Sequence, residues 1–242
     1  MRNIFIALSL LFTILNANEA DTIIKRVDQN IRGKNVYMKL QMIIKTKRHK
    51  RSIEMESWNR GKKKSFVKIL NPSRDRGITF LSLDGQMWQY IPKIERTIKI
   101  PPSMMLQNWM GSDITNDDMV KQSSLVDDYH AKLLNKKGGI ATIELRSKQN
   151  ASVVWEKIIS KIDTKHYTQI EDKFYDESGT LVRIFRYKDV KKFGNYYIPT
   201  LWSIQPQDKK DHITQIIIKD AQYDAPMQSA YFSKSALKRF SR

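Results

Sequence analysis

The segment VYMKLQMIIK, residues 36–45, decides the fold class. Its apolar side chains recur at every second position, namely Val36, Met38, Leu40, Met42 and Ile44. This period of two predicts a long β-strand with one apolar face, because successive side chains of a strand point to opposite faces. The next run alternates in the same way at Ile53 and Met55, and residues 58–61 predict a hairpin turn at its end.

Strand-like runs continue toward the end of the chain. We predict further strands over residues 64–70, 77–83, 86–91, 95–100, 126–135, 139–147, 152–162, 165–175, 180–188, 196–204 and 212–220. Turn residues separate several of them, as at Asp84-Gly85, Gly138-Gly139, Ser178-Gly179 and Gly194-Asn195. About a dozen strands with few helices predict a mainly β fold of the α+β class, built on a large antiparallel sheet or barrel.

Two regions carry helical patterns. Apolar residues at helical spacing predict an amphipathic helix over residues 19–32 that stops at Gly33. Residues 101–123 interrupt the strands, and we predict two short helices there. The first covers 104–110, and the second starts at Thr115 or Asn116 and ends near residue 122.

Composition and charge exclude several classes of protein. The chain has 242 residues, no cysteine and a formal net charge of +18. The missing cysteine excludes disulfide scaffolds, thiol catalysis, cysteine-based metal sites and a lipid-modified N-terminal cysteine. The mean hydropathy of −0.53 excludes a protein with many membrane-spanning helices.

The first residues predict export. Arg2 precedes an uncharged apolar run over residues 4–15, and small residues follow it near Ala17. This order predicts a secretory signal peptide over residues 1–17, with a buried N-terminal helix as the alternative. Cleavage would remove one arginine, which takes +18 to +17, and leave residues 18–242 as a single domain in the periplasm. Nucleic acid is therefore not an expected partner.

The sequence offers little catalytic chemistry. Its four histidines, His49, His130, His166 and His212, show no metal-ligand spacing, and no nucleophile elbow or phosphate-binding glycine loop is present. We therefore expect neither an enzyme nor a bound metal or cofactor.

Basic residues cluster at residues 45–51 and 62–64. Such runs are usually solvated loops, but they also suit transient contact with an anionic membrane surface.

The middle of the chain resembles a known family. The residues that carry the likeness are 71–80, 87–92, 96–100, 103–105, 109–113 and 115–118, with 198–202 and 231–233 further on. They resemble the LolA-like "outer membrane lipoprotein-sorting protein" family of periplasmic lipid and lipoprotein carriers. The resemblance implies a half-open barrel, formed by one strongly curved antiparallel sheet, with helices as a lid over an apolar cavity for acyl chains.

The resemblance also suggests which residues to examine. As lid candidates we take Met104, Met105, Trp109 and Met110, because methionine side chains repack around ligands of variable shape. As candidates for the cavity wall we take Phe66, Phe80, Trp88 and Tyr90, and for headgroup binding or for holding the lid Arg74, Arg76 and Arg96. For all of the apolar candidates ordinary core packing is the alternative, and for the arginines a plain surface position.

The implied function is a carrier that shields acyl chains of lipids or lipoproteins between the inner and the outer membrane. The family implies an inner-membrane donor of the ABC or RND type and an outer-membrane acceptor, and we expect a monomer. A module that senses lipids or lipoproteins and signals through a protein partner is the alternative. A periplasmic hydrolase is disfavoured because the catalytic motifs are missing.

Overall fold

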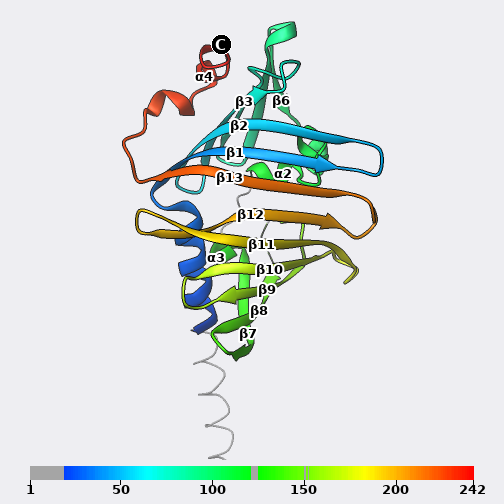
Figure 1. The fold of residues 1–242 in the computed structure, drawn as a ribbon, viewed down its shortest axis with the longest axis vertical. Helices are drawn as coiled ribbons and strands as arrows, with labels where there is room; N and C mark the ends of the chain where they lie inside the picture. Colours follow the sequence, from blue (N-terminus) through cyan, green and yellow to red (C-terminus); the bar gives the residue numbers. More distant parts are fainter. Residues whose placement is uncertain (1–18, 121–124, 150, 152) are drawn as a thin grey trace, which may run out of the picture.

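The computed structural model describes residues 19–120, 125–149, 151 and 153–242, so the predicted signal peptide lies outside the described residues. The described chain forms one sheet of 13 strands (Figure 1). Its strands are β1 (Asn35–Lys45), β2 (Lys50–Arg60), β3 (Lys64–Asn71), β4 (Thr79–Leu83), β5 (Gln86–Ile91), β6 (Arg96–Ile100), β7 (Tyr129–Lys137), β8 (Ile140–Ser147), β9 (Lys157–Asp163), β10 (Thr168–Tyr175), β11 (Leu181–Phe193), β12 (Tyr196–Pro206) and β13 (Ile213–Tyr223). The predicted mainly β fold is confirmed.

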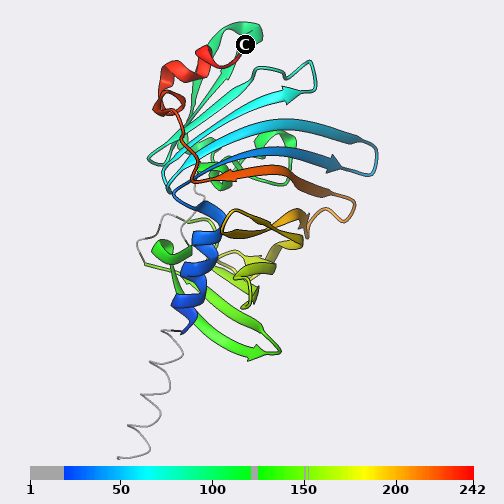
Figure 2. The ribbon, with the colours of Figure 1, turned by 60° about the vertical axis from the view of Figure 1, so that its left-hand side comes forward.

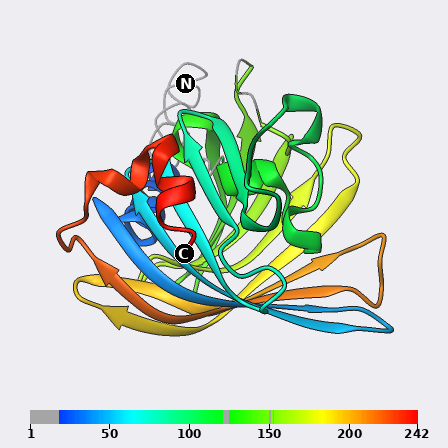
Figure 3. The same cartoon turned by 90° about the horizontal axis from the view of Figure 1, so that it is seen from above.

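The sheet is antiparallel throughout and follows the order β6-β5-β4-β3-β2-β1-β13-β12-β11-β10-β9-β8-β7. The first and last strands therefore pair in its middle, where Met42 lies opposite Ile216. Strands β6 and β7 form the two edges, so the barrel stays open. Seen from above, the sheet curves strongly around the inserted segment between β6 and β7 (Figure 3).

The predicted hairpin turns are mostly confirmed. Asp84 and Gly85 both have positive φ and join β4 to β5 through a two-residue loop. Both residues of such a type I′ turn need a left-handed backbone, which glycine and aspartate adopt at low cost. The turn expected at residues 58–61 lies further on, because β2 continues to Arg60 and Gly61 starts the reversal.

Helices are few and short apart from the first one. The predicted helix over residues 19–32 is present and crosses the β7–β12 half of the sheet (Figures 1 and 2). The others are α2 (Asn116–Val120), α3 (Leu125–Asp128) and α4 (Lys234–Arg239), with 3-10 turns η1 (Pro92–Ile94), η2 (Pro102–Met104), η3 (Trp109–Gly111) and η4 (Ser229–Phe232). Among the described residues, no helix combines the length and apolar character needed to cross a bilayer.

The predicted helix over residues 104–110 is wrong. Met110 and Gly111 both have positive φ, which ends any right-handed helix there. The chain turns back instead, and the Trp109 amide donates to the Ile114 carbonyl at 2.7 Å. The segment is thus a compact loop with two 3-10 turns.

The second predicted helix of the insert is correct at its start. The Asp118 amide donates to Thr115 Oγ1 at 3.1 Å, and the Thr115 amide donates to Asp118 Oδ2 at 2.8 Å. This reciprocal pair is a capping box, which satisfies amides that the first turn of a helix leaves open. Thr115 therefore caps α2, and Asp118 is fixed in its first turn.

Alternation along β3, β4 and β5 separates two packed faces. On the inner face, Val67, Phe80 and Met87 join the core around the insert. On the outer face, the neighbouring residues pack under the C-terminal segment, η4 and α4, which lies across this end of the sheet (Figure 2). The buried members of this outer aromatic cluster are Phe66, Leu81, Trp88, Tyr90, Ala236 and Leu237.

Candidate functional site

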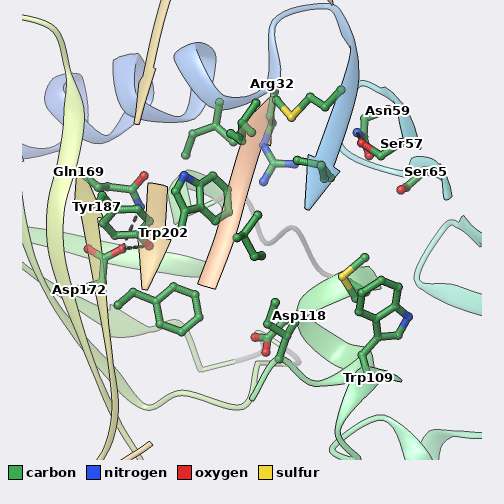
Figure 4. Close-up of a pocket in the computed structure, with 18 of the residues that line it drawn as sticks. Arg32, Ser57, Asn59, Ser65, Trp109, Asp118, Gln169, Asp172, Tyr187 and Trp202 are labelled. Atoms are coloured by element: carbon green, nitrogen blue, oxygen red, sulfur yellow. Dashed lines mark hydrogen bonds between the residues drawn. The ribbon is translucent and has the colours of Figure 1, made fainter. Parts of the chain in front are cut away.

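A cavity of about 260 Å³ lies between the inner face of the sheet, the helix over residues 19–32 and the insert (Figure 4). The apolar lining includes Val36, Met38, Leu40, Met42, Met55, Val67, Trp109, Ile114, Met119, Leu145, Trp155, Ile158, Phe174, Phe185, Trp202, Ile216 and Ile218.

The lining residues belong to nine of the 13 strands, β1 to β3 and β8 to β13, and to the helix over 19–32, the insert, α2, α3 and the loop before β9. The cavity therefore spans the middle of the sheet and reaches neither edge.

An ion pair joins the insert to the sheet beside this cavity. Arg183 on β11 donates from both terminal nitrogens to the two Asp118 oxygens, each at 2.6 Å. Burial opposes ionisation of Asp118, but the charge and hydrogen bonds of Arg183, with those of Thr115, hold its pKa below the usual value. A bidentate ion pair of this kind is stronger than a single hydrogen bond, and it fixes the relative orientation of the two side chains.

Aromatic rings surround the same guanidinium. The Arg183 Cζ lies 4.2 Å from the centre of the Trp155 ring, 4.6 Å from that of Phe174 and 4.8 Å from that of Phe185. A cation over the face of an aromatic ring is attracted by its negative π-cloud. Arg183 is therefore buried as part of the cavity wall, with its charge compensated from both sides.

A second polar group lies on β10. Asp172 accepts hydrogen bonds from Ser160 Oγ at 2.5 Å, from Gln169 Nε2 at 2.8 Å and from the Tyr187 hydroxyl at 2.8 Å (Figure 4). Burial raises the pKa of Asp172, and the three hydrogen bonds counteract part of that rise. Burial and the neighbouring Asp172 also raise the pKa of Tyr187.

The end of the cavity near the β2–β3 hairpin is polar without a net charge. Arg32, from the last turn of the first helix, donates from Nε to Asp28 Oδ1 at 2.7 Å. Ser57, Asn59 and Ser65 line the same end from β2 and β3 (Figure 4). The cavity thus has an apolar part and a distinct hydrogen-bonding part.

Two further contacts hold the insert against the sheet. Arg51 on β2 donates to the Met110 carbonyl at 3.1 Å and to Asp75 Oδ2 at 2.6 Å. Thr214 on β13 donates to Asp113 Oδ2 at 2.7 Å and accepts from the Asp113 amide at 3.0 Å. Together with Arg183, these residues attach the insert to three different strands.

None of the four predicted wall residues lines this cavity. Phe66, Trp88 and Tyr90 belong to the outer aromatic cluster and pack beneath the C-terminal segment. The reason is the pleat, because each directly follows or precedes a residue that points inward, such as Val67 or Met87. Phe80 does face inward, but it packs against Trp109 at a ring distance of 5.1 Å instead of lining the cavity.

The predicted lid residues separate into three environments. Trp109 is 2% exposed and lines the cavity. Met105 and Met110 are half-buried and pack on the core below the insert. Met104 is 36% exposed and does not belong to the lining.

The three predicted arginines lie away from the cavity. Among the described residues, the ion pair of Arg74 is with its neighbour Asp75, at 3.3 Å. Arg76 donates to the Leu70 carbonyl at 3.0 Å, and Arg96 is exposed on the edge strand β6. In the described part of the chain, Arg51 and Arg183 are arginines whose side chains do contact the insert.

The sequence did contain a signal for the residues that were missed. Arg183 falls in phase with Phe185 and Tyr187, so the alternation of β11 places its charge on the inner face. A charge in such a position needs a partner from another element, since an unpaired buried charge is costly. That argument could have found Arg183, but it could not have identified Asp118 as the partner.

Comparisons with known proteins agree with this architecture. A family model described as an uncharacterised protein matches residues 61–239, which is more than half of the chain. No curated protein matches.

Three solved structures have a similar fold. A DUF1329 family protein from Desulfovibrio piger shares 19% identity over 92% of this chain and 99% of its own, with a TM-score of 0.83. A putative outer membrane lipoprotein-sorting protein domain from Vibrio parahaemolyticus shares 20% identity over 93% and 100%, with a TM-score of 0.80. A LolA superfamily protein from Nitrosomonas europaea shares 18% identity over 90% and 98%, with a TM-score of 0.75.

Proposed function

We propose a function from one premise: this chain belongs to the family of uncharacterised proteins whose model matches residues 61–239, and its fold is LolA-like. The protein is a non-enzymatic carrier that holds acyl chains of a lipid or lipoprotein in its cavity. It takes them from an inner-membrane donor and releases them to an outer-membrane acceptor. This places the protein in the periplasm.

The observation that carries the proposal is the cavity itself. A small closed barrel is filled by its own side chains, whereas this open sheet encloses about 260 Å³ beneath the insert. Its wall combines methionine, valine, leucine and isoleucine with aromatic residues, which together offer acyl chains an apolar surface. Moving one CH₂ group from water to such a surface contributes about 0.8 kcal/mol.

The insert supports release as well as binding. It rests on the core through flexible methionines and on the sheet through side-chain contacts from Arg51, Thr214 and Arg183. These contacts, like the packing of Trp109, Ile114 and Val120 on the core, are made by side chains, so the insert can move without unpairing any strand of the sheet.

Transient contact with anionic membranes completes the proposal. The basic runs lie at opposite ends of β2, at the turns over residues 46–49 and 61–63. The protein therefore has two separate basic turns, one at each end of β2. Binding to anionic vesicles should exceed binding to neutral ones and should fall with rising salt. Equal binding to neutral vesicles at high salt would contradict this part.

The main test has two steps. Organic extracts of the protein purified from its native host are examined by mass spectrometry for bound lipid or lipoprotein. Binding of a fluorescent fatty-acyl probe is then compared for Met119→Asp, inside the cavity, and Met104→Asp, on the exposed part of the same insert. We expect at least about a tenfold loss of affinity for the first variant only, because its charge would be desolvated by the chain. Absence of both native lipid and probe binding would refute the carrier function.

A further inference from the structure

We infer that the polar end of the cavity binds the uncharged ester and hydroxyl groups of an acylglycerol, so that the cargo enters in one orientation. The inference rests on the proposed carrier function and specifies which part of the cargo contacts which wall. The site consists of Ser57, Asn59 and Ser65 on the sheet, with the Arg32–Asp28 pair opposite.

The inner face of β2 changes character along its length. Ile53 and Met55 are buried and apolar, whereas the next two inward positions carry Ser57 and Asn59. These polar residues are only 5% and 7% exposed, so surface solubility does not explain them. Asn59 lies directly opposite Ser65 on β3, which brings their side chains within contact range.

The charge of this end points to an uncharged ligand group. The only cation that lines it, among the described residues, is Arg32, and Asp28 neutralises it at 2.7 Å. A carboxylate or phosphate placed here would meet Asp28 as well as Arg32. The serine hydroxyls and the Asn59 amide instead both donate and accept, which matches the carbonyl and hydroxyl oxygens of a glycerol ester.

The rest of the cavity fits the acyl chain. On β1 the wall continues from Met38 to Leu40 and Met42, and Trp109 and Ile114 of the insert add further apolar lining. A chain whose ester lies at Ser57 and Asn59 can therefore extend along β1 toward the insert. In the reverse orientation the buried polar side chains would face methylene groups. These side chains would then lose the hydrogen bonds that water supplies in the empty cavity, which disfavours this orientation.

The test compares three ligands with the same chain length. Octane, 1-octanoylglycerol and octanoate compete with a fluorescent acyl probe for the purified full-length mature protein. We expect 1-octanoylglycerol to bind more tightly than either octane or octanoate. Tighter binding of octanoate would show an anion site and overturn the inference.

Two variants and a control locate the effect. Ser57→Ala and Asn59→Leu should each weaken 1-octanoylglycerol about fivefold, the effect of one hydrogen bond, and leave octane unchanged. Ser82→Ala removes the hydroxyl of a buried serine on β4 that does not line the cavity, and it should change the binding of neither ligand. Melting curves show which variants are folded. If Asn59→Leu does not fold, Ser57→Ala alone carries the test, because it removes only one hydroxyl group.

The outcomes separate this inference from the function on which it rests. If octane binds but the glycerol ester gains nothing from Ser57 and Asn59, the orientation is wrong and the carrier function stands. If none of the three ligands binds, the carrier function fails and the inference with it.

Discussion

The two faces of β2 and β3 are made by the same strands but packed in different ways. The outer face is closed by aromatic stacking, as between Trp58 and Tyr231, whose ring centres are 4.5 Å apart. The inner face instead borders a cavity, and the insert that covers this cavity is held by charged and hydroxyl side chains of β2, β11 and β13. One face is a core, whereas the other is a compartment.

This difference shows that, on β2 and β3, aromatic residues do not mark the wall of the compartment. Large rigid rings fill space on the outer face, where Phe66 is fully buried. On β1 to β3 the compartment is lined by non-aromatic side chains, such as Met38, Met55 and Val67, whereas aromatic lining comes from the insert and from β10 to β12, as with Trp109 and Phe174. Since methionine adapts its shape, we expect a wall of this kind to accommodate chains of different length if the protein acts as the proposed carrier.

Truncation on the outer face should have the largest effect on stability. We expect Phe66→Ala to lower the free energy of unfolding by about 4 kcal/mol, because the neighbouring side chains cannot move far enough to fill the volume of the removed ring. Denaturant unfolding measures the change. Acyl-probe binding by the molecules that remain folded should equal that of the wild type, and a selective loss of binding would break the distinction between the faces.

Removal of the buried cation should come next. Arg183→Met should cost about 3 kcal/mol, because Asp118 would lose its partner beside the cavity. Adding Asp118→Asn to this variant should restore part of the stability. If the double variant is as unstable as the single one, the cost comes from the packing of Arg183 on its aromatic neighbours.

A truncation on the compartment wall should be milder. Met55→Ala should cost about 2 kcal/mol, at the low end for such a change, because one side of the residue already borders empty space. The larger compartment should bind a longer fatty-acyl probe at least as well as the wild type does. A cost equal to that of Phe66→Ala would show that the two faces are packed alike.

The smallest effect should be a pH dependence from Asp172. Its folded pKa is raised by burial, so the folded protein holds a proton that the unfolded chain has released. Stability should therefore fall as pH rises from about 4 through the raised pKa. In Asp172→Asn this part of the pH profile should become flat, as measured by unfolding at a series of pH values. Asp118, whose pKa is lowered, acts in the opposite direction, and its contribution is lost as pH falls through its folded pKa.

Most of the fold was predictable because strand alternation and turn chemistry are local. Residues 36–45 and the Asp84-Gly85 turn needed no information from elsewhere in the chain. The helix expected over 104–110 failed because its composition suits a helix, while the backbone reverses at Met110 and Gly111 to pair with the segment that follows.

The site was less predictable because it depends on which face is covered. Alternation separates Phe66 from Val67, but only the position of the C-terminal segment determines which of them faces the compartment. The contacts of Arg51 and Arg183 with the insert join residues 59 and 65 positions apart in the chain. No spacing rule connects residues over such distances.

The openness of the sheet has a consequence for self-association. Strands β6 and β7 leave two unpaired edges, and such edges invite a strand of another copy to add on. Both edges are basic, with exposed Arg96 and Lys99 on one and exposed Lys132 and Lys137 on the other. Two copies that approach edge to edge therefore repel each other. The sheet must stay open to hold its cavity, and the lysines and arginines of its edge strands protect it against aggregation.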